Sequence, residues 1–290
     1  MENLSTIRSA EDLSLALKNA RPGEVLELGP GIFRGKWVIR TPDLTLRGAG
    51  RDQTVLIWDD YALKKDELGR DYVTFRTWTL AVCADGVTME DLTVANDAGA
   101  PEQKGQEVAL TVYADRFTMR RCGLRSTQDT LFLGPLPADL IARYEGFLPE
   151  ELRLAKVCRQ RFERCVIAGS VDFIFGCGEA VFEDCQLVSV RDVRQVGYVA
   201  APSHAPEQKK GFLFRRCRFT AEDGVNPATI WLARPWRDYG LSVFEDCQYG
   251  PHIHPLGFDK WNDTHRDQTA RFFEQPPVPG RQPWINRGRV

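Results

Sequence analysis

Residues 162–185 read FERCVIAGSVDFIFGCGEAVFEDC, and the same four-residue pattern opens and closes this stretch. The pattern consists of a large apolar residue, two charged residues and a cysteine. It occurs as FERC at 162–165 and FEDC at 182–185, and it returns as MRRC at 119–122, FRRC at 214–217 and FEDC at 244–247. TMEDL at 88–92 is a degenerate sixth copy. Copies spaced by tens of residues predict one equivalent strand in each coil of a β-solenoid.

The cysteines of these repeats are expected to form an internal ladder, because equivalent residues of stacked coils lie about 4.8 Å apart. Disulfide bonds or a metal site would be one use of such a ladder. Small buried apolar side chains are the commoner use. The chain has eight cysteines without a C-x-x-C pair, and at 290 residues it needs no disulfide staples. We therefore favour free, buried thiols.

The composition is that of an ordinary globular protein with a sizeable core. Hydrophobic residues make up 43% of the chain and charged residues 27%, and the formal net charge is −2. This balance gives no bulk electrostatic reason to expect nucleic acid or an anionic membrane as a partner. We see neither a signal peptide nor a membrane span. We expect one domain over residues 1–290, monomeric and cytoplasmic, with secretion as the alternative if a leader has been removed.

The other expected elements follow from local signals. A helix is expected after Ser9, with an apolar face of Leu13, Leu15, Ala16 and Leu17, and the NARPG segment at 19–23 ends it. Short strand-like fragments separated by turn residues follow. Residues 133–158 break this rhythm and predict an inserted surface loop, or a wall beside a cleft. Strand character is lost again from residue 260, and a Pro-rich tail over 276–290 is expected to pack outside the solenoid.

Two carboxylates occur in strand-like runs where an apolar residue is usual: Asp129 in STQDTLFLG and Asp172 in VDFIFG. Strict alternation would place Asp172 and Ile174 on one face and the neighbouring phenylalanines, with Val171, on the other, toward the core. For each aspartate, a hydrogen-bonded structural role at a strand end is an equally good interpretation.

Other polar residues stand in similarly unusual places. Arg234 lies between aromatic residues in WLARPW, which suits a guanidinium held rigidly beside a groove, or one merely stacked on Trp231 or Trp236. Gln106 and Gln128 are amides in strand context, where each needs a partner. A serine hydrolase is disfavoured, because there is no G-x-S-x-G turn and there are only four histidines. His252 and His254 lack an obvious third ligand, so we expect no metal site.

Four motifs, in order along the chain, resemble the signatures of the pectin methylesterases: GQEVAL (105–110), QDTLF (128–132), GSVDFIFG (169–176) and LARPW (232–236). Segments around them, including FERCVIAG, AVFEDC and GYVAAPS, are also similar to that family, so the resemblance extends over most of the chain. It implies a right-handed parallel β-helix that removes methyl esters from galacturonate units of pectin or methylated oligogalacturonides without a cofactor.

The resemblance also implies roles for individual residues. Asp172 would be the nucleophile and Asp129 the general acid and then base. Gln106 and Gln128 would stabilise the oxyanion, and Arg234 would orient Asp172. Trp236 would stack on a sugar ring, with Phe175 and Val171 as further candidate substrate contacts. This assignment is chemically coherent, because Arg234 would keep Asp172 ionised while a neighbouring negative charge and apolar surroundings would keep Asp129 protonated.

The sequence departs from the family pattern at two positions beside the motifs. Glu107 replaces a small residue after Gln106, and an inward Glu107 side chain would need a partner. Ala233 replaces the glycine before Arg234. Two other functions remain alternatives: a β-helical pectate lyase or depolymerase, although we see no cluster of acidic calcium ligands, and a non-catalytic polysaccharide-binding solenoid.

Overall fold

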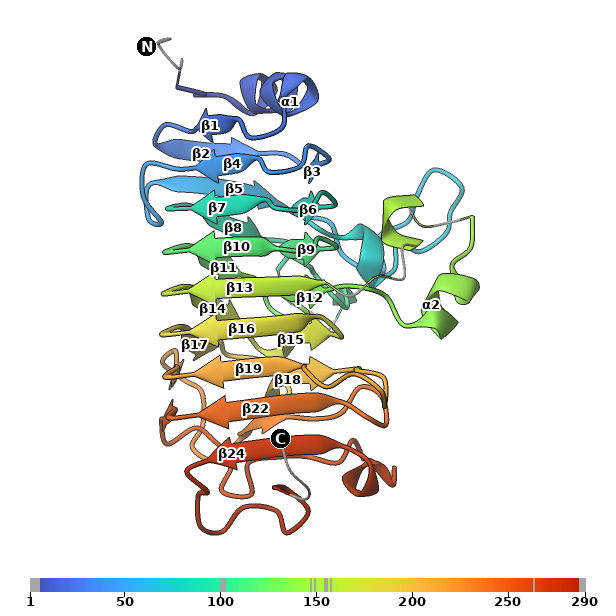
Figure 1. Ribbon diagram of the computed structural model, residues 1–290, viewed down its shortest axis with the longest axis vertical. Helices are drawn as coiled ribbons and strands as arrows, with labels where there is room; N and C mark the ends of the chain where they lie inside the picture. Colours follow the sequence, from blue (N-terminus) through green and yellow to red (C-terminus); the bar gives the residue numbers. More distant parts are fainter. Residues whose placement is uncertain are drawn as a thin grey trace.

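The chain forms a right-handed parallel β-helix. The repeats predicted a β-solenoid, and the family resemblance implied its parallel strands and right-handed coiling. The structure is a computed structural model, and it describes residues 6–99, 103–146, 148, 150–153, 156, 158–262 and 264–286. Within these residues three parallel sheets run along the stack (Figure 1). No helix among them is both long and apolar enough to cross a membrane.

Each of the first seven coils contributes one strand to each sheet, the next coil adds β22 and β23, and the last adds β24 alone, so strands distant in sequence become neighbours. The nine-stranded sheet contains β1 (Val25–Glu27), β4 (Thr45–Arg47), β7 (Thr88–Glu90), β10 (Phe117–Arg120), β13 (Arg159–Glu163), β16 (Glu179–Glu183), β19 (Phe212–Arg215), β22 (Leu241–Glu245) and β24 (Arg271–Gln275). The eight-stranded sheet contains β2 (Gly31–Arg34), β5 (Thr54–Trp58), β8 (Thr93–Asn96), β11 (Gly123–Arg125), β14 (Val166–Gly169), β17 (Gln186–Ser189), β20 (Arg218–Ala221) and β23 (Gln248–Tyr249). The seven-stranded sheet contains β3 (Trp37–Ile39), β6 (Leu80–Val82), β9 (Leu110–Val112), β12 (Leu131–Leu133), β15 (Val171–Gly176), β18 (Gly197–Pro202) and β21 (Ile230–Ala233).

The repeated motif explains how one coil stacks on the next. Its apolar residue points inward, and Phe162, Phe182, Phe214 and Phe244 form a continuous stack with successive ring centroids 4.7, 4.7 and 4.8 Å apart. Its cysteines lie in the core or at its edge as free thiols, and their Sγ atoms donate to backbone carbonyls, as Cys185 does to Phe162. The expectation of stacked, unpaired cysteines is therefore confirmed.

The residue before each cysteine of the repeated motif, and Asp91 at the same position before Leu92, turns the chain from the nine-stranded sheet into the eight-stranded sheet. Here the backbone is left-handed, with φ between +51° and +53°, at Asp91, Arg121, Arg164, Asp184, Arg216 and Asp246. Their side chains stack outside the coil, and two pairs are bridged: Arg121 to Asp91 at 2.6 Å and Arg216 to Asp184 at 2.8 Å. Exposed pairs of this kind each contribute little, so the buried stack dominates the stability of the coil.

Replacing Phe214 with alanine should lower the free energy of unfolding by about 3–5 kcal/mol, the usual effect of removing a buried phenylalanine. Phe214 is fully buried and stacks on rings in the coils before and after it. Leu213→Ala is the matched control, since Leu213 is only partly buried in the same strand and should lose less. Urea denaturation of both variants measures the difference, and equal losses would contradict the inward stack.

A helix covers the N-terminal end, as expected. Helix α1 (Ala10–Asn19) begins at Ser9, whose Oγ accepts a hydrogen bond from the Asp12 amide at 3.0 Å. Leu13 is fully buried, but Leu15 is 59% exposed. The prediction that Leu15 belongs to the apolar face is wrong, because two residues of helix rotate a side chain about 200° from Leu13.

The C-terminal region differs from the expectation in one element. Strand character was expected to be lost from residue 260, yet β24 (Arg271–Gln275) completes the nine-stranded sheet beside β22. The polar residues before this strand obscure its pattern in the sequence. In the structure, burial of Phe272 and Phe273 against the preceding coil stabilises the strand. The tail beyond residue 276 is described only to 286, and Trp284 from it packs against Phe258 and Phe272.

The segment predicted as an insertion, 133–158, forms a wall to one side of the stack (Figure 1). It begins at the end of β12 and contains helix α2 (Ala138–Arg143) and a 3-10 helix at Glu150–Arg153; residues 147, 149, 154, 155 and 157 lie outside the described part. A second 3-10 helix at Thr74–Arg76 precedes β6, and a third at Arg266–Gln268 precedes β24. Helix α2 and the segment at 74–75 line the cleft described next. The prediction that residues 133–158 form a wall beside a cleft is therefore confirmed.

Candidate active site

A cleft of about 560 Å³ lies over the seven-stranded sheet and brings most of the predicted site residues together. Those that line it are Gln106, Gln128, Asp129, Asp172, Phe175, Arg234 and Trp236. Val171 is the exception: it is buried but does not line the cleft, and its carbonyl accepts a hydrogen bond from the Asp129 amide at 3.0 Å. The expected substrate contact at Val171 is therefore wrong, because the residue is 4% exposed and is not part of the cleft lining.

Strand β15 does not alternate in the way that the sequence suggested. Its pairing with β18 shifts register between Val171 and Ile174, and Asp172 has a left-handed φ of 50°. Phe173 and Ile174 consequently both enter the core, whereas Phe175 joins the outer cluster that includes Trp236. The prediction that Phe173 and Phe175 share a face is wrong, but the bulge places Phe175 in the cleft with its ring 5.8 Å from that of Trp236.

Both candidate carboxylates sit on strained backbone. Asp129 has φ 66° and Asp172 has φ 50°, a region that residues other than glycine seldom adopt. Each is 7% exposed, so neither is well hydrated. The corner residues of the coils share this left-handed backbone, so it is the burial of the carboxyl group that distinguishes Asp129 and Asp172 from them.

Arg234 holds Asp172 through two parallel hydrogen bonds. Its Nε donates to Oδ1 at 2.8 Å and its Nη2 donates to Oδ2 at 2.7 Å. The guanidinium lies between two aromatic rings, 3.7 Å from the centroid of Tyr198 and 4.0 Å from that of Trp261. The alternative of an arginine stacked on Trp231 or Trp236 is therefore wrong, since Trp231 stacks on His254 and the guanidinium over Trp236 is that of Arg237.

The two carboxyl groups differ in electrostatic environment. Burial, followed by the negative charge of Asp172, raises the pKa of Asp129 well above its ordinary value. Burial also raises the pKa of Asp172, but the hydrogen bonds and charge of Arg234 oppose that rise. The environment therefore favours a protonated Asp129 beside an ionised, arginine-bound Asp172.

Sequence reasoning missed several groups around these residues. Tyr198 and Trp261 clamp Arg234, and Arg194 reaches Gln128 from a loop. Phe75, Asp139 and Tyr144 line the walls of the cleft. None stands in an unusual local pattern, so only the folded chain brings them to the site. In the described part of the chain, no three His, Cys, Asp or Glu side chains are grouped to hold a metal ion.

Glu107 lies directly behind the two candidate oxyanion donors. Its backbone amide donates to the Gln128 carbonyl at 3.0 Å, and its fully buried carboxyl accepts from Thr127 Oγ1 at 2.8 Å. Its other oxygen, Oε1, has no hydrogen-bond partner among the described residues. Burial raises the pKa of Glu107 to about 7, with the Thr127 hydrogen bond and the charge of Lys104 acting in the opposite direction.

Glu107→Gln should stabilise the protein at about pH 8 and change little at about pH 5. A carboxyl whose pKa rises from 4.5 to about 7 on folding binds a proton more tightly in the folded state. Its contribution to stability is therefore lost as the pH rises through that interval, by about 3 kcal/mol in total. Thermal unfolding at both pH values measures the effect, with the exposed Glu67→Gln as control. The same change in stability at both pH values would contradict a buried, titrating Glu107.

Comparison with known proteins places the chain in one family. The family model described as Pectinesterase matches residues 3–135 and 152–277. Pectinesterase 31 of Arabidopsis thaliana is 29% identical over 86% of this chain and 72% of its own length. Pectinesterase/pectinesterase inhibitor U1 of Solanum lycopersicum is 28% identical over 90% of this chain, which spans only 42% of that protein.

A solved structure gives the same result for the fold. Pectin methylesterase PemA from Erwinia chrysanthemi superposes with a TM-score of 0.79 at 24% identity, and the match covers 97% of this chain and 93% of that one. The family model covers both segments that carry the candidate site residues. This chain belongs to the pectinesterase family.

Proposed function

We propose that the protein is a pectin methylesterase, which hydrolyses the methyl esters of galacturonate units in pectin or methylated oligogalacturonides and releases methanol. The observation that carries this proposal is a pair of buried carboxyl groups in one cleft, of which, among the described residues, Asp172 alone is bound by an arginine. Membership of the pectinesterase family supports the same reaction.

In the proposed first step, an Asp172 oxygen attacks the carbonyl carbon of the methyl ester. Arg234 keeps Asp172 ionised and fixes its orientation, so that the carboxylate is available as a nucleophile. Negative charge develops on the carbonyl oxygen, where the amides of Gln106 and Gln128 donate hydrogen bonds. Asp129 gives its proton to the departing oxygen, methanol leaves, and the galacturonyl group remains joined to Asp172 as an acid anhydride.

In the second step, a water molecule attacks the galacturonyl carbonyl of the intermediate. Asp129, now ionised, takes a proton from that water, the anhydride bond breaks, and Asp172 is released as a carboxylate. The product is galacturonic acid, which releases its proton to solvent as galacturonate, and both aspartates are back in their starting states. Trp236 and Phe175 are adjacent rings in the lining of the cleft, and Trp236, the more exposed of the two, is the ring on which a sugar can stack.

The function is tested by methanol release from methylated polygalacturonate and from short methylated oligomers, with Asp129→Ala and Asp172→Ala as inactive controls. We expect methanol release, falling pH and no loss of chain length. Calcium-dependent ultraviolet absorbance from unsaturated ends would instead identify a lyase. Binding of the polymer without methanol from the wild type would identify a non-catalytic solenoid.

A further inference from the structure

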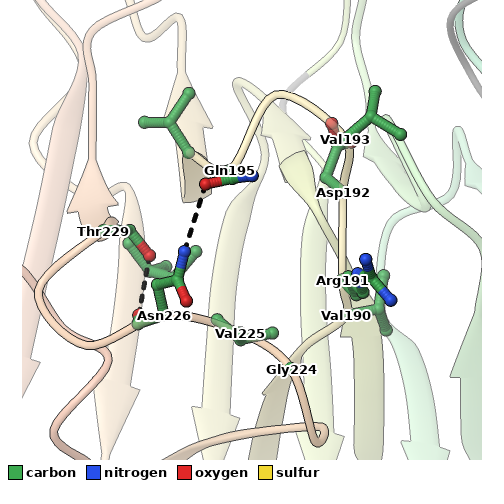
Figure 2. Close-up of a pocket in the computed structure, with 11 residues that line it drawn as sticks. Val190, Arg191, Asp192, Val193, Gln195, Gly224, Val225, Asn226 and Thr229 are labelled. Carbon is green, nitrogen blue, oxygen red and sulfur yellow. Dashed lines mark hydrogen bonds between the residues drawn. The ribbon is translucent and has the colours of Figure 1, made fainter.

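Arg194 connects a loop outside the cleft to one of the candidate oxyanion donors. It lies between β17 and β18, in a loop whose neighbouring residues line a small pocket against the next coil (Figure 2). From there its Nη1 donates to Oε1 of Gln128 at 2.8 Å. Arg194 itself does not line the cleft, so any effect on the reaction must pass through the groups that it contacts or through its charge.

Arg194 is held firmly in this position. Its Nε and Nη2 donate to the two carboxylate oxygens of Asp192 at 2.7 and 2.6 Å. The Asp192 side chain is 4% exposed, and it also accepts from Ser170 Oγ at 2.8 Å. Ser170 immediately precedes the strand that carries Asp172. The loop is tied to the following coil by Asn226, which donates to Gln195 at 3.2 Å (Figure 2).

The hydrogen bond from Arg194 fixes which end of the Gln128 side-chain amide remains available to other groups. A primary amide has nearly the same shape in its two flipped orientations, but only one end donates hydrogen bonds. Arginine carries donors alone, so it binds the oxygen end and leaves the NH₂ end for other partners. The Gln128 side chain also acts to lower the pKa of the neighbouring Asp129 carboxyl, the direction expected when an NH₂ group donates to that carboxyl.

We propose that Arg194 is a positioning residue that locks the Gln128 amide with its NH₂ group toward the reacting ester carbonyl. The proposal rests on the function proposed above, in which Gln128 stabilises the oxyanion. Without Arg194 the amide is free to flip and to present its oxygen to the developing negative charge. That orientation repels the oxyanion, so the loss falls on the transition state rather than on substrate binding.

The test uses Arg194→Met, which keeps the length of the side chain and removes its donors. We expect kcat to fall roughly 10-fold, less than the loss on the order of 10²-fold from Gln128→Ala, while KM stays within about twofold. Arg194→Lys restores a charged donor and should recover part of kcat. Arg191→Met is the matched control, because Arg191 is an exposed arginine of the same loop and should behave as wild type.

A double-mutant cycle separates positioning from other effects. In a Gln128→Ala background, Arg194→Met should cause no further loss of kcat. A loss of the same size with and without Gln128 would overturn the proposal and show that Arg194 acts by charge or by loop stability. The proposed function is tested separately, because absence of methanol release by the wild type would contradict the function and not the positioning role.

A spectroscopic readout keeps the proposal testable even if methanol is not the product. The side-chain amide of Gln128 should give one well-defined pair of ¹⁵N–¹H signals in the wild type, and these should shift or broaden in Arg194→Met. Unchanged signals in that variant would overturn the proposal.

Discussion

Asp172→Asn should abolish methanol release, with a loss of kcat on the order of 10⁴-fold or more, as for other replaced nucleophiles. The amide matches the carboxylate in shape, but it cannot attack an ester carbonyl. It also leaves Arg234 buried between Tyr198 and Trp261 without its charged partner, so the variant should be less stable as well. Initial rates of methanol release, with circular dichroism to verify folding, measure both effects.

Asp172→Glu separates catalysis from stability. It keeps the negative charge for Arg234 but moves the carboxylate by one methylene, and displacement of a reacting group by about 1 Å costs on the order of 10²-fold in rate. We expect near wild-type stability with strongly reduced methanol release. Asp238→Asn is the control, since that side chain is 65% exposed. Full methanol release by a folded Asp172→Asn variant would exclude Asp172 as the nucleophile.

The fold was predictable because its determinants repeat. The motif at 119–122, 162–165, 182–185, 214–217 and 244–247 marks one strand edge in each of five successive coils, and its phenylalanines and cysteines stack as the repeats predict. Strand β24 escaped detection because it lacks the motif. Its inward residues become recognisable only when β22 is already in place as its neighbour.

The site was predictable where a polar residue stands out from its local pattern, and not elsewhere. Asp129, Asp172 and Arg234 each interrupt an apolar or aromatic run, and the fold brings all three into one cleft. The orientation of Phe175 was not predictable, because it depends on a bulge that strict alternation does not anticipate. Arg194 lies in an ordinary polar loop, 66 residues from its partner Gln128, so only the stacking of coils reveals the contact.

The pH dependence of the reaction should follow from the two unlike carboxyl groups. Asp172 must be ionised to attack and Asp129 must be protonated to assist the leaving methanol. Because burial and the charge of Asp172 raise the pKa of Asp129, the free enzyme should stay active above the pH at which an ordinary aspartate loses its proton. kcat/KM should then fall as the pH passes the raised pKa of Asp129, and also at acid pH as Asp172 becomes protonated.

Asp129→Asn should lower kcat/KM for methyl esters by on the order of 10²–10⁴-fold and remove the alkaline fall of the profile. A nitrophenyl ester of galacturonate isolates the acid role, because its leaving group departs without a proton. With this substrate the variant should form the intermediate but not hydrolyse it, giving a burst of about one equivalent of nitrophenol per enzyme and then slow turnover. Asp139→Asn, in the same cleft but 51% exposed, is the control. An equal loss on both esters, without a burst, would contradict the acid and base role, because a residue needed only for structure or binding affects both substrates alike.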